Sequence, residues 1–282
     1  MKVLDFLRSV LALFLSLTMI ILPCAFPRVP HAKNFELVWS DEFDGDALDA
    51  EKWQGYKCSD DEAYVRRGSY WSTRVLRFED GKLHIPTTYY PDGLDGNGKP
   101  GWYTCGIVTK DIYEQRYGYF EVRCVLPKGA GLWSAFWIMC PEMENVDGTG
   151  TDGAEIDVFE SPYSTKSFNR QVSSNIHIDG YGDAHKNTNV CKPYIFLNDP
   201  YKSFNTYGVE WNEDGYTFYI NGIKTGFSDF GGASREEEYL FLSVEVGGEN
   251  AVPGDSWAEG ILSEGDEPTD FIVDYVRAYQ YK

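Results

Sequence analysis

Apolar and polar residues alternate in many short runs between residue 35 and the C-terminus. In residues 118–126, for example, Tyr119 and Glu121 would face one side of a strand, while Phe120 and Val122 would face the other. Each run is bounded by Gly, Pro, Asn or Asp, as is typical of strands joined by turns. Further runs of this kind lie at residues 82–90, 105–112, 134–140, 154–161, 173–181, 205–212, 215–222, 240–248 and 270–281.

These runs predict an all-β protein. Asn221-Gly222 lies between two apolar segments and predicts a type I′ turn, and therefore a hairpin. The sequence offers a single short helical candidate, SREEEYL at residues 234–240. So many strands with so little helix predict two antiparallel sheets packed face to face.

The composition of the 282-residue chain agrees, because aromatic residues make up 16% of it and suit strands. No repeat of fixed period and no long linker interrupts residues 35–282, so we expect one domain there. The net charge is −19, and the sequence holds no run rich in Lys and Arg. Nucleic acids and anionic membrane surfaces are therefore poor partners. No protein partner is evident, and we expect a monomer.

The N-terminus predicts a targeting segment. Lys2 and Arg8 precede an apolar run, residues 10–22, that is short for a membrane span. A basic start followed by such a run is typical of a secretory signal peptide. We therefore expect a signal peptide at residues 1–25, a short linker at 26–34 and a secreted protein. The alternative for the first segment is a membrane anchor.

Five cysteines remain beyond this leader: Cys58, Cys105, Cys124, Cys140 and Cys191. An odd number leaves at least one free thiol, and the pairing of the others cannot be read from the sequence. Buried free thiols are the favoured interpretation. The absence of a CxxC motif argues against structural zinc.

One strand, in TDGAEIDVFESP, carries three acids: Glu155, Asp157 and Glu160. Residues two apart in a strand share a face, so Glu155 and Asp157 point the same way. Glu160 is five residues beyond Glu155, and a regular strand would turn it to the opposite face. A β-bulge at Val158 or Phe159 adds one residue and brings all three acids to one face.

Paired carboxylates suit glycoside hydrolysis, in which one attacks the anomeric carbon and the other transfers a proton. We expect Asp157 to hydrogen-bond to Glu155 and to fix its orientation. Crowded acids also raise one pKa, which a general acid needs near neutral pH. Two other interpretations stay open for the isolated motif, namely a solvated strand face and a calcium site.

The residues AEIDVFE resemble the active-site strand of glycoside hydrolase family 16 in its bulged E-x-D-x-x-E form. The resemblance covers nearly all of residues 35–282. Its other parts are ELVWSDEFDGDALDAEKW, YTCGIVTKDIYEQRYGYFEVRCVLPKGAGLWSAFWIM, FNTYGVEW, YINGIKT and FIVDYVRAYQ. The bulged spacing is similar to that of laminarinases, agarases and carrageenases, whereas lichenase-type members use the unbulged E-x-D-x-E.

The resemblance implies a concanavalin A-like jelly-roll β-sandwich whose concave sheet forms a glycan cleft, and hydrolysis with retention. It implies that Glu155 is the nucleophile, Glu160 the acid/base and Asp157 the assisting carboxylate. No cofactor is expected for catalysis. Many family members bind a structural calcium, and the matching positions here are Glu42, Gly81 and Asp274.

Flat aromatic side chains make platforms for the apolar faces of sugar rings. Trp133 and Trp137 are four residues apart and would share one strand face, and Trp133 matches a family sugar-binding position. Trp102 and Trp257 are expected in loops that edge the cleft. His177 is expected on the strand next to the acids. Packing in the core is the alternative for each of these side chains.

The sequence therefore favours a secreted, retaining, endo-acting glycosidase, with β-1,3-glucan of the laminarin type as the first substrate and a β-galactan as the second. Glu249-Asn250 stands where laminarinases tend to have a Trp, and Ser134 replaces a frequent Pro; both departures weaken the case for plain β-1,3-glucan. A transglycosylase would use the same residues. A non-catalytic glycan-binding jelly roll is the alternative from another class, although a pure binder has no need of three crowded acids.

Overall fold

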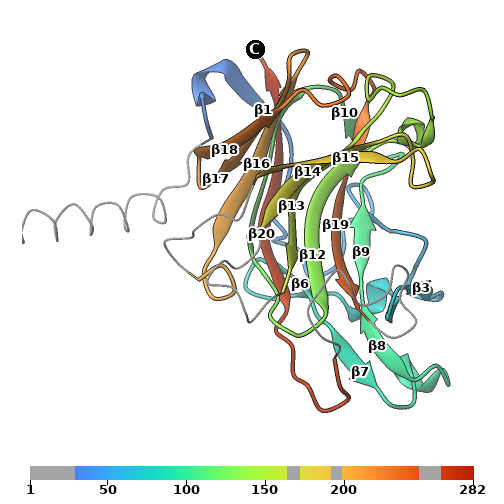
Figure 1. Ribbon diagram of the computed structural model, residues 1–282. Helices are drawn as coiled ribbons and strands as arrows, with labels where there is room; N and C mark the ends of the chain where they lie inside the picture. Colours follow the sequence, from blue (N-terminus) through green and yellow to red (C-terminus); the bar gives the residue numbers. More distant parts are fainter. Residues whose placement is uncertain (1–28, 164–171, 192–198, 248–261) are drawn as a thin grey trace, which may run out of the picture.

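The computed structural model describes residues 29–163, 172–191, 199–247 and 262–282. Two large sheets and one small sheet make up this part of the chain (Figure 1). The predicted leader at residues 1–25 lies outside it. Among the described residues, no helix is long and apolar enough to cross a membrane.

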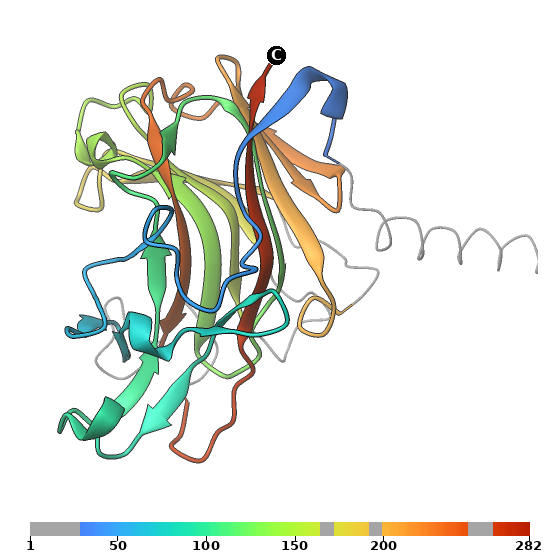
Figure 2. The ribbon, with the colours of Figure 1, turned by 180° about the vertical axis from the view of Figure 1, so that it is seen from behind.

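The first large sheet, sheet A, lies at one side of the molecule. Its strands are β1 (Phe35–Asp41), β5 (Arg77–Phe78), β6 (Leu83–Ile85), β11 (Gly118–Val125), β16 (Asn205–Asn212), β17 (Gly215–Ile220), β18 (Ile223–Ser228) and β20 (Phe271–Tyr281). Their spatial order is β18-β17-β16-β11-β20-β6-β5, with β1 paired to β20. Figure 2 shows β1, in blue, beside β20, in red. Strands from the two ends of the described chain therefore pair with each other in this sheet.

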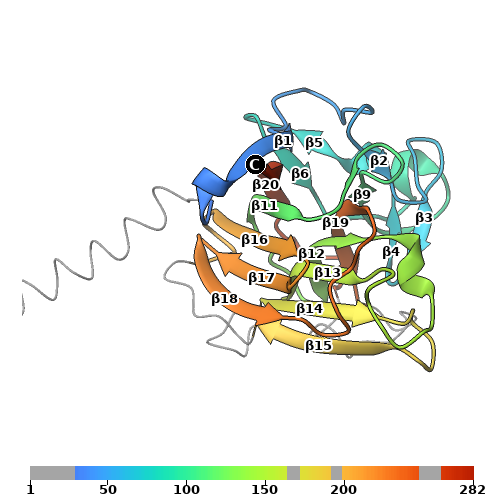
Figure 3. The same ribbon diagram turned by 90° about the horizontal axis from the view of Figure 1, so that it is seen from above.

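The second large sheet, sheet B, carries the three acids. Its strands are β2 (Gln54–Gly55), β9 (Gly106–Val108), β10 (Glu114–Gln115), β12 (Leu132–Met139), β13 (Glu155–Pro162), β14 (Ser173–Ile178), β15 (Lys186–Cys191) and β19 (Glu238–Val246). The order is β15-β14-β13-β12-β19-β9-β2, with β10 paired to β19. Figure 3 shows edge strands β15 and β18 of the two sheets on the same side of the molecule, where they contact each other.

A small third sheet extends from one end of the sandwich, where Figure 1 labels β7 and β8. It consists of β3 (Tyr64–Arg66), β4 (Ser69–Trp71), β7 (Thr88–Tyr90) and β8 (Gly101–Thr104), in the order β3-β4-β8-β7. Short 3₁₀ turns complete the described elements: η1 (Ala32–Asn34), η2 (Thr73–Val75), η3 (Leu94–Gly96) and η4 (Pro141–Glu144).

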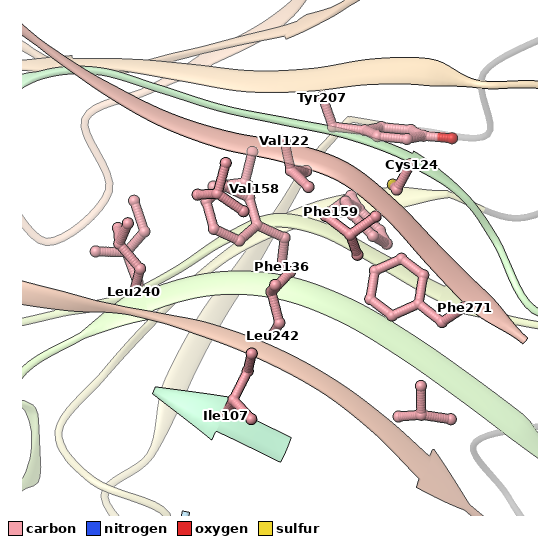
Figure 4. Packing of buried hydrophobic residues seen from close by; sticks show 14 of the residues in the cluster. Ile107, Val122, Cys124, Phe136, Val158, Phe159, Tyr207, Leu240, Leu242 and Phe271 are labelled. Carbon is pink, nitrogen blue, oxygen red and sulfur yellow. The ribbon is translucent and has the colours of Figure 1, made fainter. Parts of the chain in front are cut away.

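The hydrophobic core lies between sheets A and B and is built from the inward-facing residue of each alternating pair. Figure 4 shows Val122, Cys124 and Tyr207 of sheet A facing Val158 and Phe159 of sheet B. The rings of Phe159 and Tyr207 are 4.5 Å apart. The predicted sandwich of two antiparallel sheets is confirmed.

Two local predictions had different outcomes. The hairpin at Asn221-Gly222 is confirmed, because both residues have positive φ (51° and 73°) and Ile220 pairs with Ile223. The helix predicted at residues 234–240 is wrong, since β19 begins at Glu238. Strand pairing with β12 and β9, together with burial of every residue of β19, overrides the local preference of SREEEYL.

Four cysteines, Cys58, Cys105, Cys124 and Cys140, are free thiols, and all except Cys58 are buried. This agrees with the favoured interpretation. The side chain of Cys191 lies outside what the structure describes.

The side chains that point away from the core form two polar surfaces. We call the outer surface of sheet B, which bears Glu155, Asp157 and Glu160, the acidic face. The opposite surface, the outer face of sheet A, bears Glu121, which is buried and accepts hydrogen bonds from Tyr119 and Tyr275, each at 2.8 Å.

Candidate active site

A β-bulge in β13 places the three acids on one surface. In the pairing with β12, Phe136 lies opposite Phe159 and Trp137 opposite Asp157, so Val158 has no partner. Val158 and Phe159 both point into the core as a result. Glu160 therefore returns to the side of Glu155 and Asp157. The predicted bulge is confirmed, and Val158 is the extra residue.

Glu160 is held by three neighbours. Its Oε1 accepts a hydrogen bond from Trp133 Nε1 at 3.0 Å, and its Oε2 accepts one from Asn175 Nδ2. Burial raises the pKa of Glu160 to about 8, and the charge of Asp157 adds to the rise. The side-chain hydrogen bond to Asp157 raises the pKa of Glu160 and lowers that of Asp157. The contact between the two carboxyl groups therefore favours the protonated form of Glu160 and the ionised form of Asp157.

Asp157 is 2% exposed and lies between the two glutamates. Its Oδ2 is 3.1 Å from Nε2 of His177. Burial raises its pKa to about 7, whereas the hydrogen bonds from Glu160 and Asn175 act in the opposite direction. We expected Asp157 to hydrogen-bond to Glu155, but its partner among the acids is Glu160. The bulge brings the Glu160 carboxyl back beside Asp157, and this contact replaces the expected one.

Glu155 differs from Glu160 in its donors. The hydroxyl of Tyr181 donates a hydrogen bond to its Oε2, and Nε2 of His177 lies 3.9 Å from its Oε1. Burial raises the pKa of Glu155 to about 8, with Asp157 adding to the rise. His177 and Tyr181 both oppose this rise, because they stabilise the carboxylate.

Sequence reasoning missed Tyr181, Asn175 and His185. Nδ1 of His177 is 2.8 Å from Nε2 of His185, and the two rings are stacked with centroids 5.0 Å apart. Burial, followed by the neighbouring His177, lowers the pKa of His185. One signal was available, since Asn175 and His177 are two apart on β14 and so share a face.

The predicted aromatic residues are found in different environments. Trp133 contacts Glu160, as described. Trp137 is half-buried on the acidic face, donates to Ser243 Oγ at 3.1 Å and stacks on Phe241 with centroids 4.1 Å apart. Trp102 is not in a loop, since it lies on β8 and is buried in the core cluster. Strand pairing of β8 with β4 and β7 draws it inward. Trp257 lies outside the described residues.

The predicted calcium positions do not offer free carboxylates. Both oxygens of Glu42 accept from Arg277, at 2.9 and 2.8 Å, and Asp274 is paired with Arg123. Gly81 has a φ of 65° and contributes no side chain. Arginines therefore engage both carboxylates, and calcium binding at these positions stays a prediction.

Across the described residues, one group of three side chains could hold a metal ion: Glu155, Asp157 and His177, whose ligand atoms lie within 4.8 Å of one another. Their ion-pair contacts account for this closeness, because His177 lies against both carboxylates.

Two arginines approach the acidic face, one from the last residue of β3 and one from the turn that follows it. Arg66 and Arg67 both pair with Glu245, a buried residue that lies opposite Trp133 in the β12–β19 register. Burial lowers the pKa of Arg67 to about 10 and the charge of Arg66 adds to the fall, while Glu160 acts to raise it. A guanidinium therefore lies near the acid Glu160, and no short-range signal in the sequence predicts it.

The acidic face thus combines two buried glutamates whose pKa values are both raised to about 8: contact with Asp157 favours the protonated form of Glu160, whereas Tyr181 and His177 favour the ionised form of Glu155. A jelly-roll sandwich that carries such a pair on the outer face of one sheet defines a glycoside hydrolase. The chain belongs to glycoside hydrolase family 16: residues 35–281 match the model of the family described as beta-porphyranase A-D, GH16 domain.

Curated relatives are also glycan-cleaving enzymes by name. The chain is 30% identical over 283 residues to glucan endo-1,3-beta-glucosidase A1 of Niallia circulans, and the aligned region covers 90% of this chain and 39% of that protein. It is 28% identical over 273 residues to beta-porphyranase B of Zobellia galactanivorans, covering 90% and 87%. The chain therefore spans well under half of the first of these relatives.

Solved structures share the fold. The laminarinase catalytic domain of Thermotoga maritima superimposes with a TM-score of 0.66 at 24% identity, covering 88% of this chain and 99% of that one. An endo-acting O-glycanase of the human gut microbiota superimposes with a TM-score of 0.68 at 25% identity, covering 91% and 94%.

Proposed function

We propose that the protein is an endo-acting glycoside hydrolase that cleaves β-linked polysaccharide with retention at the anomeric carbon. The observation that carries this proposal is the unequal environment of the two glutamates. Glu160 lies against Asp157, which favours its protonated form, while Glu155 accepts a hydrogen bond from Tyr181, which favours its ionised form. One glutamate is therefore prepared as an acid and the other as a nucleophile.

The reaction proceeds in two displacements. Glu155 attacks the anomeric carbon while the glycosidic bond breaks, and the departing oxygen takes the proton of Glu160. A water molecule then gives a proton to Glu160 and attacks the same carbon, which releases Glu155 as a carboxylate. Asp157 accepts a hydrogen bond from Glu160 when Glu160 is protonated, so it holds the proton donor in place between turnovers.

The first substrate candidate is β-1,3-glucan. The support for it is the relative from Niallia circulans, whose name states endo-1,3-β-glucosidase activity. The half-exposed ring of Trp133 beside Glu160 would form a platform for a glucose ring.

The second candidate is a β-galactan that carries anionic groups, and a specific observation favours it. Arg66 and Arg67 bring two positive charges to a single carboxylate, Glu245, near Glu160. Their excess positive charge on a protein of net charge −19 would attract a sulfate or carboxylate on the glycan. The porphyranase family match and a relative named keratan-sulfate endo-1,4-beta-galactosidase from Sphingobacterium multivorum support this candidate.

The test is hydrolysis of a panel that contains laminarin, lichenan, agarose, porphyran and keratan sulfate, with Glu155→Gln and Glu160→Gln as controls. We expect new reducing ends from the wild type and none from Glu155→Gln. NMR of the first-formed product should show the β anomer, and an α anomer would refute retention. Binding to these glycans without turnover by the wild type would show a glycan-binding protein instead. Oligosaccharides longer than the starting acceptor would show transglycosylation.

We also propose export, which the apolar run at residues 10–22 supports, so that the mature chain acts outside the cytoplasm. We further propose that it acts as a monomer. Intact-mass measurement of the protein from the culture medium would locate the new N-terminus. A full-length chain retained in the membrane fraction would show an anchor.

A further inference from the structure

Tyr181 combines an exposed ring with a buried hydrogen bond. The residue is 54% exposed, yet its hydroxyl donates to Oε2 of Glu155, which is 8% exposed. Holding an exposed tyrosine in one rotamer costs side-chain entropy. The contact therefore persists only if no further entropy is lost in ordering the backbone, which requires that the backbone at Tyr181 is already well held.

The turn that carries Tyr181 is anchored on two sides. Asp179 has a φ of 63° and a buried side chain, whose Oδ1 accepts from the backbone amides of residues 147 and 148, at 3.1 and 2.8 Å. Its Oδ2 accepts from Lys186 Nζ at 2.8 Å. The amide of Gly180 donates to a carbonyl of η4 at 2.8 Å. Tyr181 thus follows two residues that are bound to a neighbouring loop.

The histidine pair supports the same side of the site. The rings of Tyr181 and His185 have centroids 5.9 Å apart, and His185 contacts His177, which lies against Asp157. Tyr181, His185 and His177 therefore form a continuous wall next to Glu155.

The two oxygens of Glu155 are unequal as a result. Oε2 accepts the hydrogen bond from Tyr181, whereas Oε1 lies 3.9 Å from the nearest nitrogen of His177, beyond hydrogen-bond distance. The oxygen that attacks a sugar must keep a lone pair free, and no hydrogen bond among the described residues is made to Oε1.

We infer that Tyr181 is a positioning residue for the nucleophile: its hydroxyl fixes Oε2 of Glu155 and leaves Oε1 as the oxygen that bonds to the anomeric carbon. This inference rests on the proposed function. The Oε1–carbon bond forms as the glycosidic carbon–oxygen bond breaks, and the proton for the leaving oxygen comes from Glu160. The Tyr181 hydroxyl gives up no proton. It donates more strongly to the free carboxylate than to the ester, and so it favours release of Glu155 in the second step.

The test is Tyr181→Phe, which removes the hydroxyl and keeps the ring. Tyr219→Phe is a matched control, because Tyr219 donates to Glu210 at 3.1 Å on the outer face of sheet A. We expect Tyr181→Phe to lower kcat about 10-fold with little change in KM, and to move the acid limb of kcat/KM to higher pH, since Glu155 loses a donor that favours its ionised form. Tyr219→Phe should leave kcat and the limb unchanged.

A second readout needs no turnover. The carboxyl carbon of Glu155, assigned in a ¹³C NMR titration by its loss in Glu155→Gln, should titrate at higher pH in Tyr181→Phe than in the wild type. An unchanged titration would overturn the inference even if the enzyme is active, and a shifted one would support it even if every glycan on the panel resists cleavage. A change in KM alone would also overturn it, because Tyr181 would then contact only the sugar.

Discussion

The two outer faces of the sandwich use buried carboxylates in opposite ways. On the acidic face, Glu155, Asp157 and Glu160 crowd one another, and burial raises the pKa of all three. On the outer face of sheet A, Glu121 stands apart from other acids and each of its oxygens accepts from a tyrosine. Burial raises the pKa of Glu121 as well, and both oxygens of Glu160 also accept hydrogen bonds, so crowding among the acids is what separates the two faces.

Arginine marks the same difference. Both oxygens of Glu42 accept from Arg277 on the outer face of sheet A, and this contact lowers the pKa of Glu42. On the acidic face Arg66 and Arg67 pair with Glu245, while Tyr181, Trp133 and Asn175 donate the hydrogen bonds to Glu155 and Glu160. A guanidinium paired directly with Glu160, as Arg277 is with Glu42, would lower the pKa of a group that must keep its proton.

The largest expected effect separates the two faces by activity. Glu155→Gln should lower kcat about 10⁴-fold or more, because the nucleophile is lost, while the melting temperature stays within about 2 °C of the wild type. Hydrolysis assays and thermal unfolding measure both quantities. A variant that retains a tenth of the activity would end the assignment of Glu155.

The corresponding change on the other face should act on stability alone. In Glu121→Gln an amide NH₂ group replaces one of the two acceptor oxygens, so one buried tyrosine hydroxyl loses its acceptor. We therefore expect a loss of about 2 kcal/mol in the free energy of unfolding. Urea denaturation at neutral pH measures this loss. The activity of the folded variant should remain within about two-fold of the wild type, and a larger drop would mean that the two faces are coupled.

A third comparison uses pH. The folded-state pKa values of the three central acids are raised, so their contribution to stability is present below about pH 4 and is lost as the pH rises through about 8. We expect the unfolding free energy of the wild type to fall between these limits, and Glu160→Gln to reduce the fall by on the order of 2 kcal/mol. Urea denaturation at pH 5 and pH 8 tests this.

Glu42 contributes to the pH dependence of stability in the opposite sense, since its pKa is lowered. An equal fall in the wild type and in Glu160→Gln would show that Glu160 is not the group that holds the proton.

The smallest effect concerns one donor. Trp133→Phe keeps an aromatic ring but removes the indole hydrogen bond that lowers the pKa of Glu160. The alkaline limb of kcat/KM should move up by about half a pH unit. Trp137→Phe is the matched control, because its indole donates to Ser243 instead. Equal shifts in both variants would mean that the indole hydrogen bond does not tune the acid.

Much of the fold was available from the sequence because alternation and turns are local. The odd offset of Glu160 from Asp157 predicted a bulge, and the hairpin followed from Asn221-Gly222. The strand that begins at Glu238 was predicted as a helix, since its stability comes from partners more than 100 residues earlier in the chain.

The site was only partly available for the same reason. Glu155, Asp157 and Glu160 are close in sequence, so their spacing carried information. Tyr181 lies 26 residues beyond Glu155 and reaches it only through the anchored turn after β14. Arg67 comes from a different sheet, and nothing near it in the chain points to the acids.

The extra residue Val158 and the bulge that accommodates it compensate each other. Deletion of Val158 would remove the bulge and restore regular alternation, with Phe159 still directed toward the core and Glu160 still on the acidic face, one residue closer to Asp157. Substitutions at this position keep the count and should be tolerated when the side chain remains apolar. The three acids can therefore share one face with or without the extra residue, provided that the bulge is gained or lost together with it.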